Sequence, residues 1–348
     1  MKHTHLHTRL LALLLCCALV LPLSACGEAK STTQQIFAMD TVMDLTAYGK
    51  KADDGINAAI SIINSMDKLL DPENERSKTY EINHAMGSPV VVNEQIAKML
   101  RTALTVYERT NGAFDLTTYP LSKLWGFIDQ NYRVPSDAEI ERLLPCVDMS
   151  KVQLSATDDS ANSLVTMPAD MALSFGAVAK GCASDYAIQA MRAAGVTSGV
   201  VSLGGNVQTL GKKPDGSDWN IAIQDPNNTG SYLGYLTVGE TAVITSGSYQ
   251  RYFTEGGQKY HHILSPTTGR PVNNGLLAVT IVCEDGTLAD CLSTAMFVLG
   301  PQAALNYWRT YGGFEMLLVK TDGHVVLTNG LYGQFTPNGD SYVVDYAS

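Results

Sequence analysis

An aspartate and a threonine stand four residues apart in a segment that is otherwise largely apolar, Asp290 to Phe297. In a helix this spacing places the side chains of Asp290 and Thr294 on the same face. An unpaired carboxylate would be costly to bury among apolar neighbours, and a bound hard cation such as Mg²⁺ would remove that cost. The alternative is that Asp290 only caps a helix that begins after Gly286-Thr287.

A second chemical pattern is the glycine-rich segment Gly176-Ala177-Val178-Ala179-Lys180-Gly181, which Asp185 follows. It has the form of a tight turn that opens a helix, and the backbone N–H groups of a helix start favour an anion. Lys180 would add a point charge for a phosphate. The alternative is a solvated lysine on an ordinary helix.

A third pattern, Val201-Ser202-Leu203-Gly204-Gly205-Asn206, reads as a strand that ends in two glycines and an asparagine. Paired glycines let a ligand approach the backbone closely. The same residues would also serve as a plain hairpin turn, and the pattern alone leaves both interpretations open.

Residues 245–271 gather hydroxyl groups, three tyrosines, two arginines and the adjacent pair His261-His262. Aromatic rings can hold a flat heterocycle, and a histidine can take a proton from an attacking hydroxyl. No third ligand stands at metal spacing from the two histidines, so a zinc site is not expected here.

Hydrophobic periodicity predicts the elements that must position these residues. Helices are expected at 54–70, at 94–110, after Ser136, at 177–194 and at 288–299, the last ending at Gly300-Pro301. Strands are expected at 90–92, 200–203, 220–223, 242–245, 277–283, 316–320 and 325–328. This order predicts an α+β fold, with mixed sheets flanked by helices and a small appended, loop-rich subregion at 112–175.

The N-terminus predicts export. Lys2 and Arg9 precede an apolar run that ends in Leu23-Ser24-Ala25-Cys26, which is typical of a signal peptide over 1–25. The ending resembles a bacterial lipobox, so we expect lipidation of Cys26 and a location on the extracytoplasmic face of the cell membrane. The alternative is an ordinary signal peptide with a chance cysteine. Residues 26–35 are interpreted as a tether and 36–348 as the functional domain.

Composition narrows the class of partner. The chain has 24 basic and 34 acidic residues, for a net charge of −10, and loss of Lys2 and Arg9 with the signal would make it more acidic. This balance argues against nucleic-acid binding. Beyond Cys26, the cysteines Cys146, Cys182, Cys283 and Cys291 form no C-x-x-C motif, so free thiols are expected, and a disulfide stays open.

Taken together and in this order, the motifs resemble the FAD:protein FMN transferase family, the ApbE-type flavin transferases. The resemblance covers nearly the whole chain after the tether. It rests on Phe37–Thr41, Gly112–Thr117, Leu124–Phe127, Gly176–Gly181, Gly204-Gly205, Thr245–Gly247, His262-Ile263 with Pro266 and Gly269, and Ala289-Asp290 with Thr294.

The resemblance implies an enzyme that moves FMN from FAD to a threonine hydroxyl of an exported acceptor protein and releases AMP, with Mg²⁺ as cofactor. His262 matches the general base. The Mg²⁺ ligands would be the Ala177 carbonyl, Asp290 and Thr294. The positions that match FAD contacts are Met39, Ala113, Phe114, Asp115, Ser174, Lys180 and Ile263.

The chain departs from the family pattern in places. Ser174 stands where the family commonly has Asp, Ser265 and Thr267 replace a frequent Asp and basic residue, and Glu73 falls near a common aromatic position. Two alternatives therefore stay open. One is a pyrophosphatase that splits FAD into FMN and AMP, and the other is a flavin-binding lipoprotein without turnover.

Overall fold

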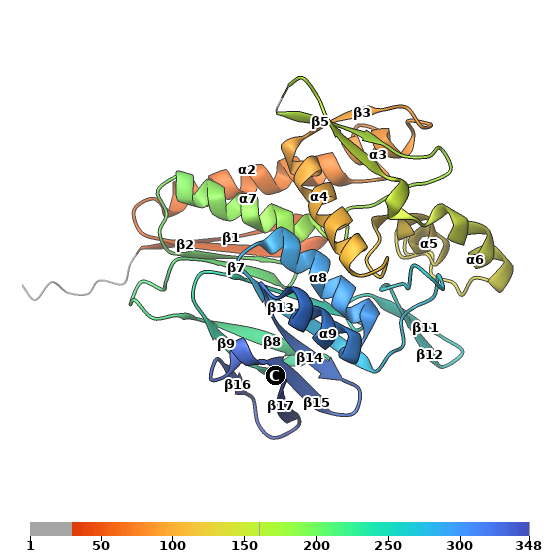
Figure 1. The fold of residues 1–348 in the computed structure, drawn as a ribbon. Coiled ribbons are helices and arrows are strands. Elements are labelled where there is room, and N and C mark those ends of the chain that lie inside the picture. The colour runs from red at the N-terminus through yellow and green to blue at the C-terminus, as the bar shows by residue number, and fades with distance from the viewer. Residues whose placement is uncertain (1–29, 160, 348) are drawn as a thin grey trace, which may run out of the picture. The chain divides into compact units, whose positions relative to one another are not determined.

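A sheet of nine strands forms the centre of the fold (Figure 1). The computed structural model describes residues 30–159 and 161–347, so the predicted signal peptide and Cys26 lie outside the described residues. The strand order is β1-β2-β6-β7-β10-β13-β14-β15-β17, and each neighbouring pair is antiparallel except β15 with β17. The bounds of these strands are Ser31–Ala38, Thr41–Tyr48, Gly199–Leu203, Asn206–Leu210, Ala242–Gly247, Leu276–Cys283, Glu315–Lys320, His324–Thr328 and Val343–Ala347.

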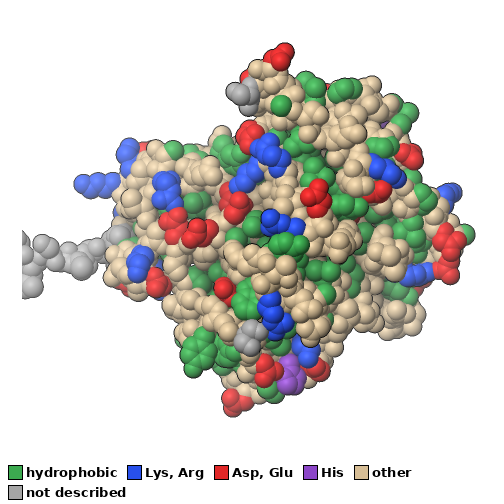
Figure 2. Space-filling view, viewed as in Figure 1, with side chains coloured by type: hydrophobic (Ala, Val, Ile, Leu, Met, Phe, Trp, Pro, Cys, Tyr) green, Lys and Arg blue, Asp and Glu red, His purple; other side chains and the backbone are tan. Residues whose placement is uncertain are grey.

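Helices cover one face of this sheet, and a small sheet covers the other (Figure 1). The main core lies beneath the helices α2 (Ala52–Leu70), α4 (Glu94–Arg109), α7 (Ala179–Ala193), α8 (Gly286–Leu299) and α9 (Pro301–Tyr311). A second core on the opposite face packs against β8 (Trp219–Asp225), β9 (Asn228–Val238) and β16 (Phe335–Pro337). On the face that carries the helices, Figure 2 shows acidic and basic side chains interspersed.

The helices follow from the spacing of their apolar residues. In α2 the fully buried residues Ile56, Ala59, Ile63 and Met66 recur at three and four positions, so that one stripe faces the core. Helix α8 is apolar on most of its surface because it is covered by the sheet, α7 and α9. None of the helices in the described ranges combines the length and apolar character needed to cross a bilayer.

Part of the predicted subregion at 112–175 forms a small core of its own, whereas Phe114 and Met149 of the same range belong to the main core. Trp125 and Phe127 are buried there with Leu121, and the Trp125 indole donates to the carbonyl of Gly269 at 2.8 Å. The elements of this region and its neighbours are α3 (Lys78–Asn83), β3 (Val90–Asn93), α5 (Tyr119–Leu124), α6 (Asp137–Leu143), β4 (Gln153–Ala156), β5 (Asn162–Thr166), β11 (Tyr252–Glu255) and β12 (Gln258–His261). Short 3₁₀ turns occupy Leu116–Thr118, Leu144–Cys146, Met149–Lys151 and Asn329–Leu331.

The predicted α+β class, the five helices and the seven strands are confirmed, with boundaries that shift by up to two residues. The structure differs in two places. Residues 31–35 of the predicted tether instead lie in β1, where each pairs with a residue of β2. Gly300-Pro301 ends one helix as predicted, but Pro301 also begins α9, because proline suits the first position of a helix.

Helices α7 and α8 are in close contact at Gly181 and Gly286. A Cβ atom on Gly181 would lie 2.1 Å from the Gly286 carbonyl oxygen, and one on Gly286 would lie 2.8 Å from the Gly181 carbonyl oxygen. Neither position has room for a side chain. The contact fixes how the N-terminal turn of each helix faces the other.

Gly181→Ala therefore tests the close contact. Alanine normally favours a helix interior over glycine, but here the added methyl must push α8 away, and we expect the free energy of unfolding to fall by about 1–3 kcal/mol. Urea denaturation measures it. Gly239→Ala is the control, because its Cβ would lie 3.9 Å from the nearest atom. Equal stability of Gly181→Ala and the unaltered protein would contradict the prediction.

Candidate active site

Asp290 is the residue around which the sequence motifs meet. Its side chain is 3% exposed on α8. One carboxylate oxygen accepts the N–H of Gly181 at 2.8 Å, and the other accepts the side-chain amide of Asn206 at 2.9 Å. Gly181 belongs to the glycine-rich segment and Asn206 to the Gly-Gly-Asn turn. Three of the four motifs are therefore joined by hydrogen bonds to one buried carboxylate.

The fourth motif joins one turn further along α8. The hydroxyl of Ser246, on β10, lies 3.1 Å from the Thr294 hydroxyl and 2.8 Å from the Ser293 hydroxyl. Asp290 and Thr294 thus stand on the face of α8 that looks toward β7 and β10, as their spacing predicted. The helix-cap alternative is wrong for Asp290, because Asp285 is the residue whose side chain caps α8, accepting the N–H of Leu288.

The Ala177 carbonyl is open to a ligand. In a regular helix it would accept the N–H of the residue four positions on, but that N–H, of Gly181, donates to Asp290. Within the described ranges no protein group hydrogen-bonds to this carbonyl oxygen. It lies at the N-terminal turn that leads into α7, just before the helix that Asp290 contacts.

These groups suit a hard cation. Asp290 has only neutral hydrogen-bond donors, and it forms no ion pair with the basic residues that the structure describes. Its carboxylate, the Thr294 hydroxyl and the Ala177 carbonyl are the oxygen ligands that Mg²⁺ prefers. The described residues contain no group of three or more His, Cys, Asp or Glu side chains placed to hold a metal. A metal here would therefore depend on this mixed set of oxygen atoms.

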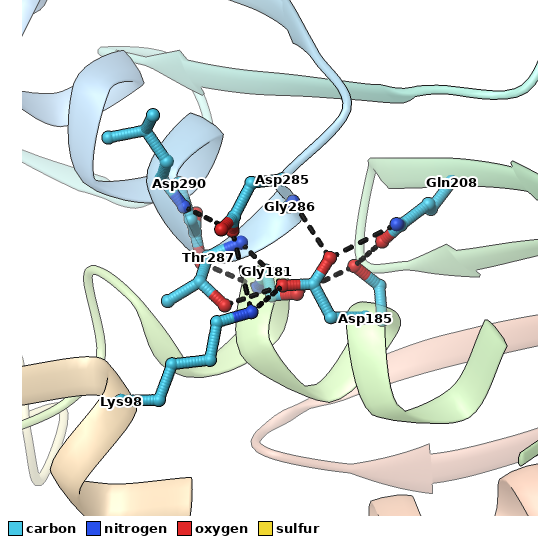
Figure 3. Close-up of polar contacts among 10 residues, drawn as sticks. Lys98, Gly181, Asp185, Gln208, Asp285, Gly286, Thr287 and Asp290 are labelled. Carbon is cyan, nitrogen blue, oxygen red and sulfur yellow. Dashed lines mark hydrogen bonds and ion pairs between the residues drawn. The ribbon is translucent and has the colours of Figure 1, made fainter. Parts of the chain in front are cut away.

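A second buried carboxylate, Asp185 on α7, mirrors the first (Figure 3). It accepts the N–H groups of Gly286 at 2.8 Å and Thr287 at 3.0 Å, and the Thr287 hydroxyl at 2.6 Å. The aspartate of each helix thus accepts hydrogen bonds from the first turn of the other helix. The amide of Gln208 also donates to Asp185 at 3.1 Å, two residues along β7 from the amide that holds Asp290.

Unlike Asp290, Asp185 has its own cation. The ammonium of Lys98, on α4, lies 2.7 Å from Asp185 and 3.6 Å from Asp285 (Figure 3). Burial opposes the charge of Asp185, but Lys98 and the hydrogen bonds from Thr287 and Gly286 outweigh it and lower its pKa. Lys98 and Gln208 were not predicted from the sequence. The one available signal was Asp185 itself, a carboxylate on the helix that follows the glycine-rich segment.

The adjacent histidines have different surroundings. Both ring nitrogens of His261 are used inside the protein, since Nε2 donates to the Val272 carbonyl at 2.8 Å and Nδ1 accepts the N–H of Ile263 at 3.3 Å. His262 Nδ1 lies 3.1 Å from the Arg251 carbonyl, which can only accept. Nδ1 therefore carries the proton, and Nε2 keeps a free lone pair. His261 is a structural residue, and His262 is the one able to take a proton.

Positive charge gathers near His262. Burial, the guanidinium of Arg251 and, more weakly, the ammonium of Lys180 lower the pKa of His262 to about 3. The ring is thus neutral at physiological pH. Lys180, at the start of α7, is thus close enough to His262 for its charge to act on the ring. Within the described ranges the Lys180 ammonium has no hydrogen bond or ion pair with the protein, so its charge is available to an anion.

Met39 occupies the turn between β1 and β2. Met39 and Asp40 both have left-handed backbones, with φ of 49° and 58°, a conformation that non-glycine residues seldom adopt. The carboxylate of Asp67 accepts the Met39 N–H at 2.7 Å and holds the turn. The turn lies beside Gly204, whose Cβ would come within 2.5 Å of the Thr41 hydroxyl. Such strain is often found where a ligand binds.

Asp115 and Ser174, two of the remaining predicted FAD contacts, lie in segments that a backbone hydrogen bond joins. Asp115 uses both carboxylate oxygens internally, accepting from Thr117 and from the N–H of Met149. Burial raises its pKa even though these bonds oppose the shift. The Ser174 hydroxyl accepts the N–H of Gly176 at 3.2 Å, while its own N–H donates to Leu116. Ser174 therefore links this segment to the glycine-rich turn.

The side chains of Phe114 and Ile263 are buried in the core, and Ala113 is half-buried. Ligand contacts from Phe114 and Ile263 would therefore be made by their backbone groups. Glu73, the notable departure, accepts the Tyr119 hydroxyl and lies 3.0 Å from the Lys123 ammonium. The bond from Tyr119 lowers the pKa of Glu73 despite partial burial. Its charge is thus already engaged by protein groups.

Comparison with known proteins supports the same interpretation. The sequence profile of the ApbE family matches residues 39–318. The FAD:protein FMN transferase of Treponema pallidum is 29% identical over 326 residues, covering 88% of this chain and 90% of that protein. The protein of the same name from Klebsiella pneumoniae is 30% identical over 285 residues, covering 81% and 87%.

Solved structures agree. The crystal structure of the ApbE protein from Thermotoga maritima matches with a TM-score of 0.81 at 30% identity, covering 88% of this chain and 100% of that one. The flavin transferase ApbE from Vibrio cholerae has the same fold, with a TM-score of 0.75 at 23% identity, covering 84% of this chain and 94% of that one. The fold and site thus define an α+β transferase. The chain belongs to the ApbE family, and the resemblance predicted from its ordered motifs is confirmed.

The neutral state of His262 can be measured directly. Because its pKa is lowered to about 3, its ring resonances in NMR should not titrate between pH 5 and 8. The folded state takes up this proton less readily than the unfolded chain, so His262 should make the protein less stable as the pH falls from about 6.5 toward 3. The ring resonance of His262 is identified as the one that is missing from the spectrum of the His262→Asn variant. A midpoint near 6.5 for His262 would contradict the lowered pKa and the part that Arg251 and Lys180 play in it.

Proposed function

We propose that this protein transfers the FMN half of FAD to a threonine hydroxyl of an exported acceptor protein, in a Mg²⁺-dependent reaction that releases AMP. The observation that carries the proposal is the meeting of three motifs at Asp290, a buried carboxylate without a cation of its own, with the fourth motif joined to Thr294 one turn further along α8. The names of the relatives from Treponema pallidum and Klebsiella pneumoniae support FAD as the donor and a protein as the acceptor.

The reaction is a substitution at phosphorus. The threonine oxygen forms a bond to the phosphorus of the FMN phosphate, and the anhydride bond to AMP breaks. The threonine proton passes to Nε2 of His262, which is neutral and holds a free lone pair. The AMP phosphate takes the electron pair of the broken bond. His262 therefore acts on the acceptor, and the groups on α7 and α8 act on the donor.

Charge on the FAD pyrophosphate has two counterparts in the site. Lys180, at the start of α7, supplies a positive charge beside the backbone N–H groups of the helix start. Asp290, Thr294 and the Ala177 carbonyl would hold Mg²⁺ against the pyrophosphate. When bound, Mg²⁺ would neutralise the phosphates and stabilise the charge on the departing AMP. The Met39 turn and the segment 113–115 would hold the rest of FAD.

The decisive experiment is mass spectrometry of a candidate threonine-bearing acceptor after incubation with the protein, FAD and MgCl₂. The proposal predicts an acceptor that gains the mass of FMN and an equal amount of AMP. AMP released with FAD alone, without acceptor labelling, would favour the pyrophosphatase. FAD binding without AMP under all these conditions would leave only the binding lipoprotein. An acidic residue near the site would favour the pyrophosphatase, and Glu73, the candidate for it, is paired with Lys123.

Asp290→Asn tests the metal site within this reaction. The substitution keeps the shape and removes the negative charge, so the fold should survive while Mg²⁺-dependent AMP release falls about 10²-fold or more. Thr294→Val should act in the same direction with a smaller effect. The control is Asp322→Asn, an exposed carboxylate paired with Lys320 on the β14–β15 turn. Turnover of Asp290→Asn at the parent rate would remove this residue from the mechanism.

The location of the enzyme is a separate part of the proposal. We propose that the signal peptide is cleaved before Cys26 and that lipid on its thiol anchors the protein to the extracytoplasmic face of the membrane. Cys26→Ala should move the mature protein from the membrane fraction to the soluble fraction or leave it unprocessed. Intact mass and fractionation measure this. An unchanged mass and distribution would refute the anchor without affecting the chemistry above.

A further inference from the structure

We propose that Asp185 is a positioning residue that holds the first turn of α8, and through it Asp290, in place for the metal. The proposal rests on the proposed function, because Asp290 matters here as a metal ligand. Asp185 contacts neither Asp290 nor the open Ala177 carbonyl among the hydrogen bonds of the described residues. Its effect must pass through the helix that it holds.

The first turn of α8 is closed by two aspartates. A helix start leaves its first N–H groups without partners inside the helix. Asp285 accepts the N–H of Leu288 in the usual manner of a cap. The N–H groups of Gly286 and Thr287 go instead to Asp185, which reaches across from α7. The orientation of this turn is thus set by another helix and not by its own cap alone.

Asp290 lies about 6 Å along the axis from Gly286, since a helix rises 1.5 Å per residue. A tilt or retreat of the first turn would therefore move the Asp290 carboxylate directly. The Gly181–Gly286 contact leaves no space to absorb such a movement. On the far side, the Gly181 N–H and Asn206 amide that hold Asp290 have fixed places on α7 and β7. Loss of Asp185 should thus disturb the geometry of the metal ligands.

The charges of the two carboxylates explain why one binds protein and the other can bind metal. Asp185 is neutralised by Lys98 at 2.7 Å, and Gln208, Thr287 and two backbone N–H groups saturate its oxygens. Asp290 accepts only two neutral donors. Lys98 thus neutralises Asp185 from within the chain. Asp290 has no such partner, and a bound cation would have to neutralise it.

The test compares Asp185→Asn with the unaltered full-length protein. Mn²⁺, as a probe for the metal site, is titrated by electron paramagnetic resonance in the presence of FAD. We expect the Mn²⁺ dissociation constant to rise about tenfold or more, while FAD affinity without metal stays within about twofold. Hydrogen exchange measured by NMR should accelerate at the amides of Gly286 and Thr287. A purely structural role would lower stability without a selective change in metal affinity.

Leu236→Ala is the matched control, because Leu236 is fully buried in the second core on the opposite face of the sheet. It should destabilise the fold while metal affinity stays at the parent value. A metal affinity that is unchanged in Asp185→Asn, or weakened equally in Leu236→Ala, would overturn the proposal.

Two further outcomes complete the test. If Asp185→Asn does not fold, Thr287→Val removes only the hydroxyl bond to Asp185 and should weaken Mn²⁺ binding in the same direction. Unchanged Mn²⁺ affinity in Thr287→Val would then overturn the proposal. Failure of the unaltered protein to bind Mn²⁺ with FAD would overturn the proposed metal site itself. That result differs from the case in which only the Asp185 variant behaves like the parent.

Discussion

The close contact between α7 and α8 is the constraint on which the site depends. At Gly181 and Gly286 the two backbones meet without side chains between them. Only at this distance can each helix place an aspartate on the N–H groups of the other's first turn. Burial of two carboxylates side by side would be costly without these bonds. Packing and electrostatics therefore support each other. The glycines permit the close contact of α7 and α8, and the hydrogen bonds to the carboxylates stabilise it.

The sheet beneath the helices gives this contact a fixed base. Asn206 and Gln208 are two apart on β7, so both side chains leave the same face of the strand, toward the helices. Each amide reaches one of the two aspartates. On β10, the neighbour of β7, Ser246 reaches Thr294. Asp290 and Thr294 are thus supported by adjacent strands rather than by loops, which suits a site that must hold its geometry during the reaction.

The sequence predicted the helices and the candidate reacting residues better than it predicted the strands and ion pairs that hold those residues in place. Periodic apolar residues were sufficient for α2, and the spacing of Asp290 and Thr294 was sufficient for their shared face. The strand β1 was missed because its residues Ser31 to Gln35 are polar, as expected of an edge strand with much of its surface in water. The pair Lys98–Asp185 spans 87 positions in the sequence, and no local pattern links residues so far apart.

The hairpin β11–β12 shows how much depends on strand register. Its two-residue turn, Gly256-Gly257, has positive φ at both positions and fixes which residues pair across the strands. A slip by one residue would turn every side chain of β12 to the opposite face. His261 would then leave its buried position, and His262, which directly follows β12, would lose its contact with the Arg251 carbonyl. One residue inserted at this turn would thus displace His262 from the site while leaving every reacting group in the sequence.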